Sequence, residues 1–438
     1  MGNRKSLAKR ILTSSYAWSF VAKGFHILCG LFVTVFVNRA LGAELKGQYA
    51  YVHNLITVLA IVGGLGIYQV YPFRRRQEGE EAKRKFCGVT IALAIIYSVF
   101  VLAYVLGTLF TNGGGFDSSL IICLFAGINM VGKIVETQFA MFASIDDFKR
   151  CKKFALVMEV SRLLIFLMVF LFFKKNVVAV LFGDCLYFFL GIIMNSTIMN
   201  LWKLKPVFKA ENLLVILKLG FIPMLFQLLL QLNYNIDVLY MKSFSSVSLA
   251  NIGLYSVGVQ LAAYIWTIPD IFKEVLYSKT AKDDSISDII WCLRISVIVE
   301  LIFLLGVFLL GDKILLLLYG EEFVPAITVT KIIFAGVLAM TLFKVLTPLY
   351  NAKGRFIGNF IILFISVSMN VVLNIILIPK YDMIGAAIAS VAGYGICGVV
   401  YLTRFCIDFK IPIWKIIFFG KKDIKELING HLPAGKKK

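Results

Sequence analysis

The chain has 438 residues, 60% of them hydrophobic, and a mean hydropathy of +0.86. This composition excludes an ordinary soluble globular protein and predicts a membrane protein. The formal net charge of +20 comes from short clusters of Lys and Arg between apolar segments, so the acidic partner is expected to be the lipid bilayer and not nucleic acid.

Twelve apolar segments are each long enough to cross a bilayer, which predicts an all-α, polytopic membrane protein. They are expected at 15–37, 49–71, 86–110, 118–143, 154–173 and 177–199, and then at 213–240, 250–272, 289–310, 325–350, 357–379 and 382–405. Six segments form an N-terminal lobe, residues 1–205, and six a C-terminal lobe, residues 206–405. A basic tail, residues 406–438, is expected either to lie on the inner leaflet as an amphipathic segment or to be disordered.

The basic residues also predict the orientation of the chain. Most of the 45 Lys and Arg residues lie before the first segment, in the even-numbered connections and in the tail. Positively charged connections stay in the cytoplasm, so both termini are expected there. Because each lobe has an even number of segments, the two lobes have the same orientation and are parallel repeats.

The sequence itself carries traces of this repeat. Gly47 and Tyr49 recur as Gly253 and Tyr255 at one common separation. The tripeptide Phe-Ala-Gly at 125–127 likewise recurs at 334–336, and Gly191 recurs as Gly398. Chance similarity between apolar segments is the alternative explanation. A duplicated membrane unit is typical of transporters whose two halves move against each other.

Three pairs of ionisable side chains lie inside predicted segments at helical spacing, and each pair therefore shares one helix face. They are Lys23 with His26, Lys133 with Glu136, and Glu159 with Arg162. We expect the last pair to be an internal ion pair that holds helices together. A charge at the membrane centre costs about 2.5–3.5 kcal/mol, so it should face a polar cavity or a partner. Lys23 has no acidic residue within one helical turn, which favours a cavity, whereas Lys133 and Glu136 either form an internal ion pair or contact the substrate.

The seventh segment is the most polar. Gln227, Gln231 and Asn235 form one stripe, and Asn233 and Asp237 form a second. We expect Lys23, His26, Lys133, Gln227, Gln231 and Asn235 to bind the substrate. Asp237, with Glu136 and Asp184 as further candidates, is expected to bind a coupling H⁺ or Na⁺; the alternative is a carboxylate that only holds neighbouring helices together.

No catalytic or metal-binding motif can be assembled from the sequence. The three His and eight Cys residues do not have the spacing of a metal or redox site, and no phosphate-binding loop or catalytic triad appears. We therefore expect no enzymatic activity, no metal and no cofactor apart from a coupling ion.

Several short stretches in both halves resemble Wzx-type polysaccharide or O-antigen repeat-unit flippases of the multidrug/oligosaccharidyl-lipid/polysaccharide (MOP) exporter superfamily. They are Asn38 to Gly42, Gly47 to Tyr49, Ile252 to Ser256, Leu318 to Phe323, Asn351 to Arg355 and Asn374 to Ala389. The individual motifs are loose, but they occur in order over nearly the whole chain.

The resemblance implies a MATE-like, V-shaped bundle in the bacterial inner membrane, with segments one, two, seven and eight lining the cleft. It also implies a substrate, an undecaprenyl-diphosphate-linked oligosaccharide for O-antigen or capsule, which alternating access moves to the outer leaflet. Polysaccharide polymerase and glycosyltransferases would be the partners. Asp237 and the amides of segment seven depart from the strongly cationic cleft that the resemblance implies.

Two alternatives remain open. A cation-coupled, MATE-like multidrug exporter of the same superfamily would need an acidic cleft, whereas the ionisable residues within these segments lean basic. A membrane-embedded glycosyltransferase or polymerase would need a catalytic cluster near the membrane interface.

Overall fold

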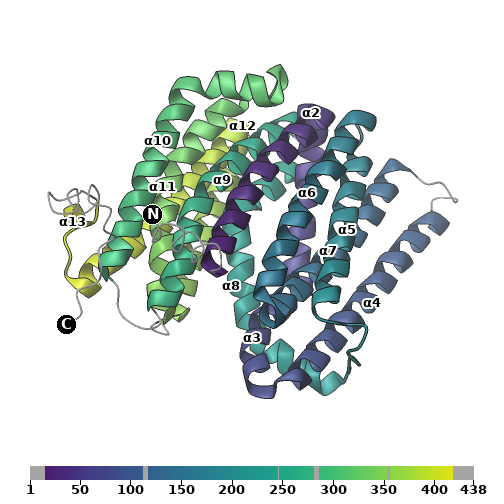
Figure 1. Ribbon diagram of the computed structural model, residues 1–438. Coiled ribbons are helices and arrows are strands. Elements are labelled where there is room, and N and C mark those ends of the chain that lie inside the picture. Colours follow the sequence, from purple (N-terminus) through teal and green to yellow (C-terminus); the bar gives the residue numbers. More distant parts are fainter. Residues whose placement is uncertain (1–14, 112–116, 245, 281–285, 353–355, 418–438) are drawn as a thin grey trace, which may run out of the picture. The chain divides into compact units, whose positions relative to one another are not determined.

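All regular elements in the described part of the chain are helices (Figure 1). The computed structural model describes residues 15–111, 117–244, 246–280, 286–352 and 356–417. The helical content of these residues confirms the predicted all-α membrane architecture. The helices are α2 (Ser15–Gly63), α3 (Ile67–Glu78), α4 (Glu80–Thr111), α5 (Ser118–Asp146), α6 (Phe148–Phe172), α7 (Val177–Ile198), α8 (Ala210–Ser243), α9 (Leu249–Thr280), α10 (Ile286–Tyr319), η1 (Glu321–Phe323), α11 (Ala326–Ala352), α12 (Phe356–Phe409) and α13 (Ile413–Ile417).

Within the described residues, 10 helical stretches are long and apolar enough to cross a membrane. Two of them, Lys23–Glu78 with 56 residues and Ile357–Phe409 with 53 residues, are far longer than the ~20 residues that one crossing needs. Each contains one residue with non-helical backbone angles, Gly42 in α2 and Asp382 in α12. The ten stretches thus leave room for the twelve predicted crossings, and that count stays a prediction.

The two kinks replace connections that the sequence predicts as loops. Gly42 has a φ of 73°, a conformation that glycine adopts without a steric penalty. Asp382 has a φ of 51°, and its Oδ2 accepts a hydrogen bond of 2.5 Å from Asn251 Nδ2. Lys46 falls between the first two predicted segments, yet it lies in the helical part of α2 that follows Gly42, and it is buried.

The chain divides into two compact units, residues 1–228 and residues 229–438. The division falls within α8, whereas the predicted lobe boundary precedes this helix; the lobe boundary stays a prediction.

Two apolar clusters lie in the core of the described part of the first unit. One surrounds Tyr71, Phe86 and Phe142, whose rings are 4.1–6.1 Å apart. The other joins the apolar faces of α2, α6 and α7 and includes Val37 and Tyr49. Tyr49 is therefore anchored by apolar packing while its hydroxyl group remains available for polar contacts.

Ion pairs and backbone hydrogen bonds show which connections of the first unit share an end. Lys83 Nζ lies 2.5 Å from Asp146 Oδ2 and donates to the Met199 carbonyl at 2.8 Å, so the start of α4 and the ends of α5 and α7 lie together. The Lys175 amide donates to the Ala40 carbonyl at 2.7 Å, which joins the kink of α2 to the α6–α7 connection. Among the described connections, the second, fourth and sixth thus lie at one end and the first and fifth lie together, as expected when successive helices cross a membrane in opposite directions.

Only the beginning of the predicted basic tail lies within the described residues. It contains α13, and the Ile416 carbonyl accepts a hydrogen bond of 3.2 Å from Arg294 Nε. The two expectations for the tail concern mainly residues 418–438, which lie outside the described part.

Candidate functional site

A polar network in the first unit is built on one face of α2. Tyr49, His53 and Thr57 recur at intervals of four residues, which places them on the same face of the helix. Tyr49 Oη donates to Asp184 Oδ2 on α7 at 2.9 Å and lies 3.3 Å from His53 Nδ1. Lys133 on α5 donates from Nζ to Thr57 Oγ1 at 2.6 Å. Three helices thus contribute to one network.

A second polar group joins α2 to α6. His26 Nδ1 lies 2.7 Å from Glu159 Oε1. The other oxygen of this carboxylate lies 3.8 Å from Arg162 Nη1, and the Arg162 guanidinium stands 5.6 Å from the centre of the Tyr187 ring.

The acidic and basic members of these groups differ in exposure. The side chains of Asp184 and Glu159 are largely buried, with 12% and 9% of their accessible surface exposed. The side chains of His26, His53 and Arg162 retain 52%, 40% and 29% of their accessible surface. A ligand that reaches this part of the unit therefore meets mainly basic nitrogen atoms.

The structure resolves the two alternatives for Lys133 only in part. The ammonium group donates to Thr57, while the side chain of Glu136 packs against Gly191, where a Cβ atom would lie 2.8 Å from Glu136 Cγ. Asp184 and Glu136 are nonetheless close enough to Lys133 to interact with it electrostatically. Lys23 lies half-buried on α2, one turn before His26.

In the second unit the predicted coupling carboxylate is fully enclosed. Asp237 has no accessible surface, and its two oxygen atoms accept four hydrogen bonds from neutral side chains. Oδ2 accepts from Tyr255 at 2.7 Å and from Ser390 at 2.6 Å, and Oδ1 accepts from Asn374 at 2.6 Å and from Asn370 at 3.1 Å. The donors come from α9 and α12, so the carboxylate joins three helices.

The two polar stripes of α8 therefore have different environments. Asn233 is buried beside Asp237 and accepts a hydrogen bond of 2.9 Å from Ser366. The members of the other stripe are half-buried; they are Gln227, Gln231 and Asn235. Both stripes were singled out from the sequence, but their difference in burial could not be predicted, because it depends on the packing of α12.

The networks of the two units share one geometric element, which agrees with the predicted repeat. Tyr49 bonds to Asp184 and Tyr255 contacts Ser390, and in both cases the partners are 135 residues apart. Tyr255 Oη and Ser390 Oγ lie 3.0 Å apart. Ser390 thus occupies the position in the second unit that corresponds to Asp184 in the first. The carboxylate of the second network is that of Asp237 on α8.

Several residues of these networks were missed from the sequence. Tyr49 and Tyr255 were noticed only as repeat markers, although both supply hydroxyl groups to carboxylates. Applying the same repeat separation to Asp184 would have led to Ser390. His53 carried no such signal, and neither did the Asn370–Asn374 pair, since amides are common in membrane helices.

Comparison with solved structures identifies the fold. Lipid II flippase MurJ in an inward closed conformation superposes with a TM-score of 0.72 at 19% identity, over 94% of this chain and 90% of that one. An inward-facing MATE multidrug resistance transporter of the MOP superfamily gives 0.66 at 12% identity, over 88% and 96%. A MOP superfamily transporter from Pyrococcus furiosus, whose description refers to a binding pocket of reverse polarity, gives 0.60 at 13%, over 90% and 95%. The chain thus has the multi-pass membrane fold of this superfamily.

Sequence comparison identifies the family. The profile of the family described as polysaccharide biosynthesis protein matches residues 36–328, and the chain belongs to this family. An uncharacterized membrane protein of Methanocaldococcus jannaschii is 32% identical over 114 residues, a match that takes in 26% of this chain and 22% of that protein.

Proposed function

We propose that the protein is a flippase that moves undecaprenyl-diphosphate-linked oligosaccharides from the inner to the outer leaflet of the bacterial inner membrane by alternating access. The observation that carries this proposal is the difference in exposure within the first unit, where the carboxylates are buried and the bases attached to them remain partly exposed. Membership of a polysaccharide biosynthesis family supports the same substrate class.

A diphosphate suits this arrangement chemically. Its oxygen atoms accept charge-assisted hydrogen bonds, and an arginine side chain can present two parallel N–H groups to them. Arg162 and Lys133 supply such donors, with the imidazoles of His26 and His53 beside them. An exporter of organic cations would need the reverse arrangement, with exposed carboxylates and buried bases. The half-buried amides Gln227, Gln231 and Asn235 are proposed to contact the sugars.

Asp237 is proposed to bind the coupling ion. Four neutral donors stabilise its carboxylate but leave its negative charge uncompensated inside an apolar bundle. A proton neutralises this charge directly. Na⁺ would also do so, since hard cations prefer oxygen ligands and the hydroxyl groups of Tyr255 and Ser390 supply them. An ion bound more tightly in one conformation of the transporter shifts the equilibrium toward that conformation.

The proposed substrate also defines partners on both sides of the membrane. With both termini in the cytoplasm, glycosyltransferases at the inner leaflet would assemble the lipid-linked unit. A polysaccharide polymerase would use the unit after its release at the outer leaflet.

Replacing Lys133 by Met tests the proposal, because it removes the charge at similar volume. One charge-assisted hydrogen bond contributes about 1.5–3 kcal/mol, so binding of undecaprenyl-diphosphate-linked oligosaccharide to the purified protein should weaken about 10- to 150-fold. The matched control is Lys331→Met in the second unit, where the lysine lies 5.5 Å from the centre of the Phe308 ring. This control should bind like the wild type.

Flipping of a fluorescent lipid-linked oligosaccharide in proteoliposomes provides the functional measurement. Undiminished binding and flipping by Lys133→Met would argue against the basic site. Tight binding of tetraphenylphosphonium by the wild type, unaffected by the oligosaccharide, would instead favour a multidrug exporter.

A further inference from the structure

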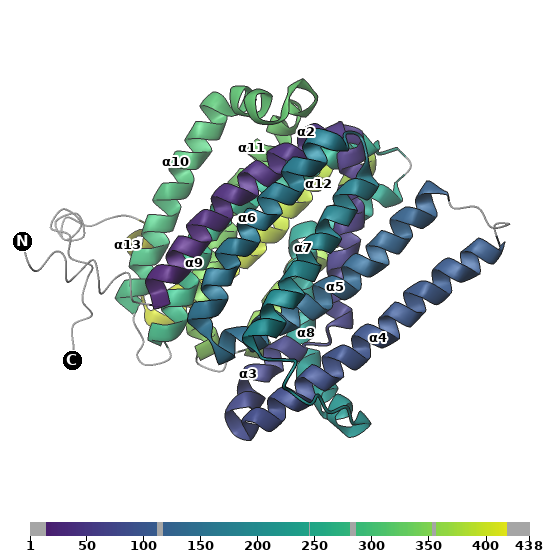
Figure 2. The ribbon, with the colours of Figure 1, turned by 45° about the vertical axis from the view of Figure 1, so that its right-hand side comes forward.

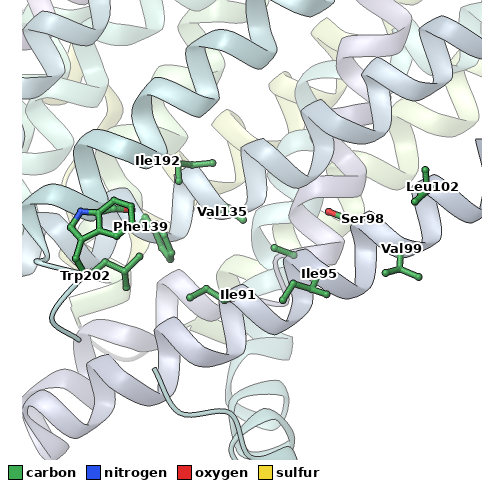
Figure 3. Close-up of a pocket in the computed structure, with 12 residues that line it drawn as sticks. Ile91, Ile95, Ser98, Val99, Leu102, Val135, Phe139, Ile192 and Trp202 are labelled. Atoms are coloured by element: carbon green, nitrogen blue, oxygen red, sulfur yellow. The ribbon is translucent and has the colours of Figure 1, made fainter. Parts of the chain in front are cut away.

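The first unit carries an apolar groove that is separate from its polar network. The groove has a volume of about 520 Å³ and is lined by residues of α4, α5 and α7 (Figure 3). Figure 2 shows the course of these three helices. Ile91, Ile95 and Leu102 line it from α4, while Val135 and Ile192 line it from α5 and α7. Trp202 closes one end, and Leu102 lies at the other (Figure 3).

Polar contacts at the Trp202 end fix the shape of the groove. The segment after α7 is fastened to α4 because Lys83 Nζ donates to the Met199 carbonyl and Arg84 Nε donates to the Lys205 carbonyl at 2.9 Å. The Val207 amide donates back to the Arg84 carbonyl at 3.0 Å. Gly88 permits this close approach, since a Cβ atom there would lie 2.3 Å from the Val207 carbonyl oxygen.

The length of the groove matches one leaflet of a bilayer. Ile91 and Leu102 mark its extent along α4, and with a rise of 1.5 Å per residue they are about 16 Å apart along the helix axis. Half of a bilayer's hydrocarbon core is about 15 Å thick. A phospholipid acyl chain fits this length, whereas an undecaprenyl chain, with its eleven isoprene units, is too long for it.

The residues at the Trp202 end have the character of a headgroup site. The Trp202 side chain is exposed, as is typical of tryptophan at the membrane–water interface. Two further exposed basic residues, Lys203 and Lys205, lie in the segment after α7 that is fastened to α4. A third, Arg84, lies near the start of α4. Basic pockets between membrane helices on the cytoplasmic side attract anionic headgroups.

We propose that this groove binds one anionic phospholipid, with an acyl chain between α4, α5 and α7 and its phosphate group at Lys203 and Lys205. The occupant comes from the leaflet that borders these lysines. The site does not depend on the proposed transport function, because none of its residues belongs to the polar networks.

Photo-crosslinking of the wild-type protein in nanodiscs tests the site directly. The probe is phosphatidylglycerol with a diazirine in its acyl chain, compared with phosphatidylcholine that carries the same diazirine. We expect labelled peptides to contain residues 91–102 and 192–202, with at least about tenfold more labelling by the anionic probe, since two lysines attract its headgroup. Equal labelling by the two probes, or labelling spread evenly over the lipid-facing helices, would overturn the proposal.

Two pairs of variants separate the chain site from the headgroup site. Ala94→Phe fills the groove and should reduce the labelling of these peptides at least about tenfold, whereas Ala103→Phe, at an exposed position on the same helix, should not. Lys203→Ala combined with Lys205→Ala should remove the preference for the anionic probe, and Lys149→Ala combined with Lys152→Ala should retain it.

The same assay decides whether the groove binds a membrane phospholipid or the prenyl lipid that carries the proposed substrate. Undecaprenyl phosphate should not compete with phosphatidylglycerol for the groove. Displacement of the probe at equimolar undecaprenyl phosphate would show that the groove holds the prenyl chain and would overturn the phospholipid assignment. If Ala94→Phe does not fold, the peptide map of the wild-type protein still gives the answer.

Discussion

Asp184 and Asp237 both accept a hydrogen bond from a tyrosine, but their surroundings give them different chemistry. Asp184 lies in the unit that also holds the basic residues Arg162, Lys133 and Lys46, and its Oδ2 is 3.9 Å from His53 Nδ1. Asp237 is surrounded by hydroxyl and amide donors that carry no net charge. The second carboxylate therefore depends more strongly on an external cation.

Asp237→Asn should remove coupling and leave substrate binding largely intact. Asparagine keeps the shape of the side chain and much of its hydrogen bonding but holds no charge to attract H⁺ or Na⁺. We expect flipping in proteoliposomes to lose its dependence on an imposed ion gradient. The affinity for the lipid-linked oligosaccharide should stay within about twofold of wild type, which is well below the tenfold change that 1.4 kcal/mol of binding free energy produces.

Glu300→Gln is the matched control for this substitution. Glu300 is a buried carboxylic residue of the same unit whose Oε1 accepts a hydrogen bond from Thr341, and its replacement should leave the gradient response unchanged. A wild-type gradient response of Asp237→Asn would make Asp237 a structural residue. Glu136 and Asp184 would then be the next candidates.

Among single residues, the sequence predicted the ionisable groups better than their partners. Asp237 was singled out because burying a charged carboxylate within a membrane helix costs free energy, and that argument is independent of the fold. Its donors Asn370, Asn374 and Ser390 lie more than 130 residues away. Only the packing of α8 against α12 brings them together, and no local pattern encodes it.

At the scale of elements, helix bodies were predictable and bends were not. Predicted segments 118–143 and 177–199 correspond closely to α5 and α7, because long apolar runs end at polar residues. The breaks near Gly42 and Asp382 resembled loops in sequence, yet the chain stays helical on both sides of each. Backbone groups in an apolar medium need internal hydrogen bonds, and this favours a kinked helix over an open loop.

The kink of α12 provides a stability prediction. A Cβ atom at Gly385 would lie 2.4 Å from the Leu377 carbonyl oxygen across the bend, so Gly385→Ala forces the backbone apart and should destabilise the protein by about 1–3 kcal/mol. Gly395, in the same helix, has no such neighbour within 4 Å, and Gly395→Ala should be neutral or slightly stabilising. Thermal unfolding in detergent measures both; equal Tm values for the two variants would contradict the close approach.

At the scale of the whole molecule, the alternation of connections in the first unit supports the predicted topology but does not define which side is cytoplasmic. Single cysteines in a background without the eight natural ones can determine this. Cysteines at Thr111 and Glu321 should react with an impermeant thiol reagent in intact cells, and cysteines at Gln77 and Lys209 should react only after the membrane is opened. All four positions are exposed. Labelling of Gln77→Cys in intact cells would reverse the orientation.

The separation of 135 residues between Tyr49 and Asp184 has a consequence for biosynthesis. A ribosome adding about 5–20 residues per second needs roughly 7–27 s to make that stretch. During this interval the helix that carries Tyr49 and Lys46 has left the ribosome, while Asp184, the hydrogen-bond acceptor of Tyr49, has not yet been made. We therefore expect the segment that carries Lys46 to enter the lipid more readily once α7 has been made.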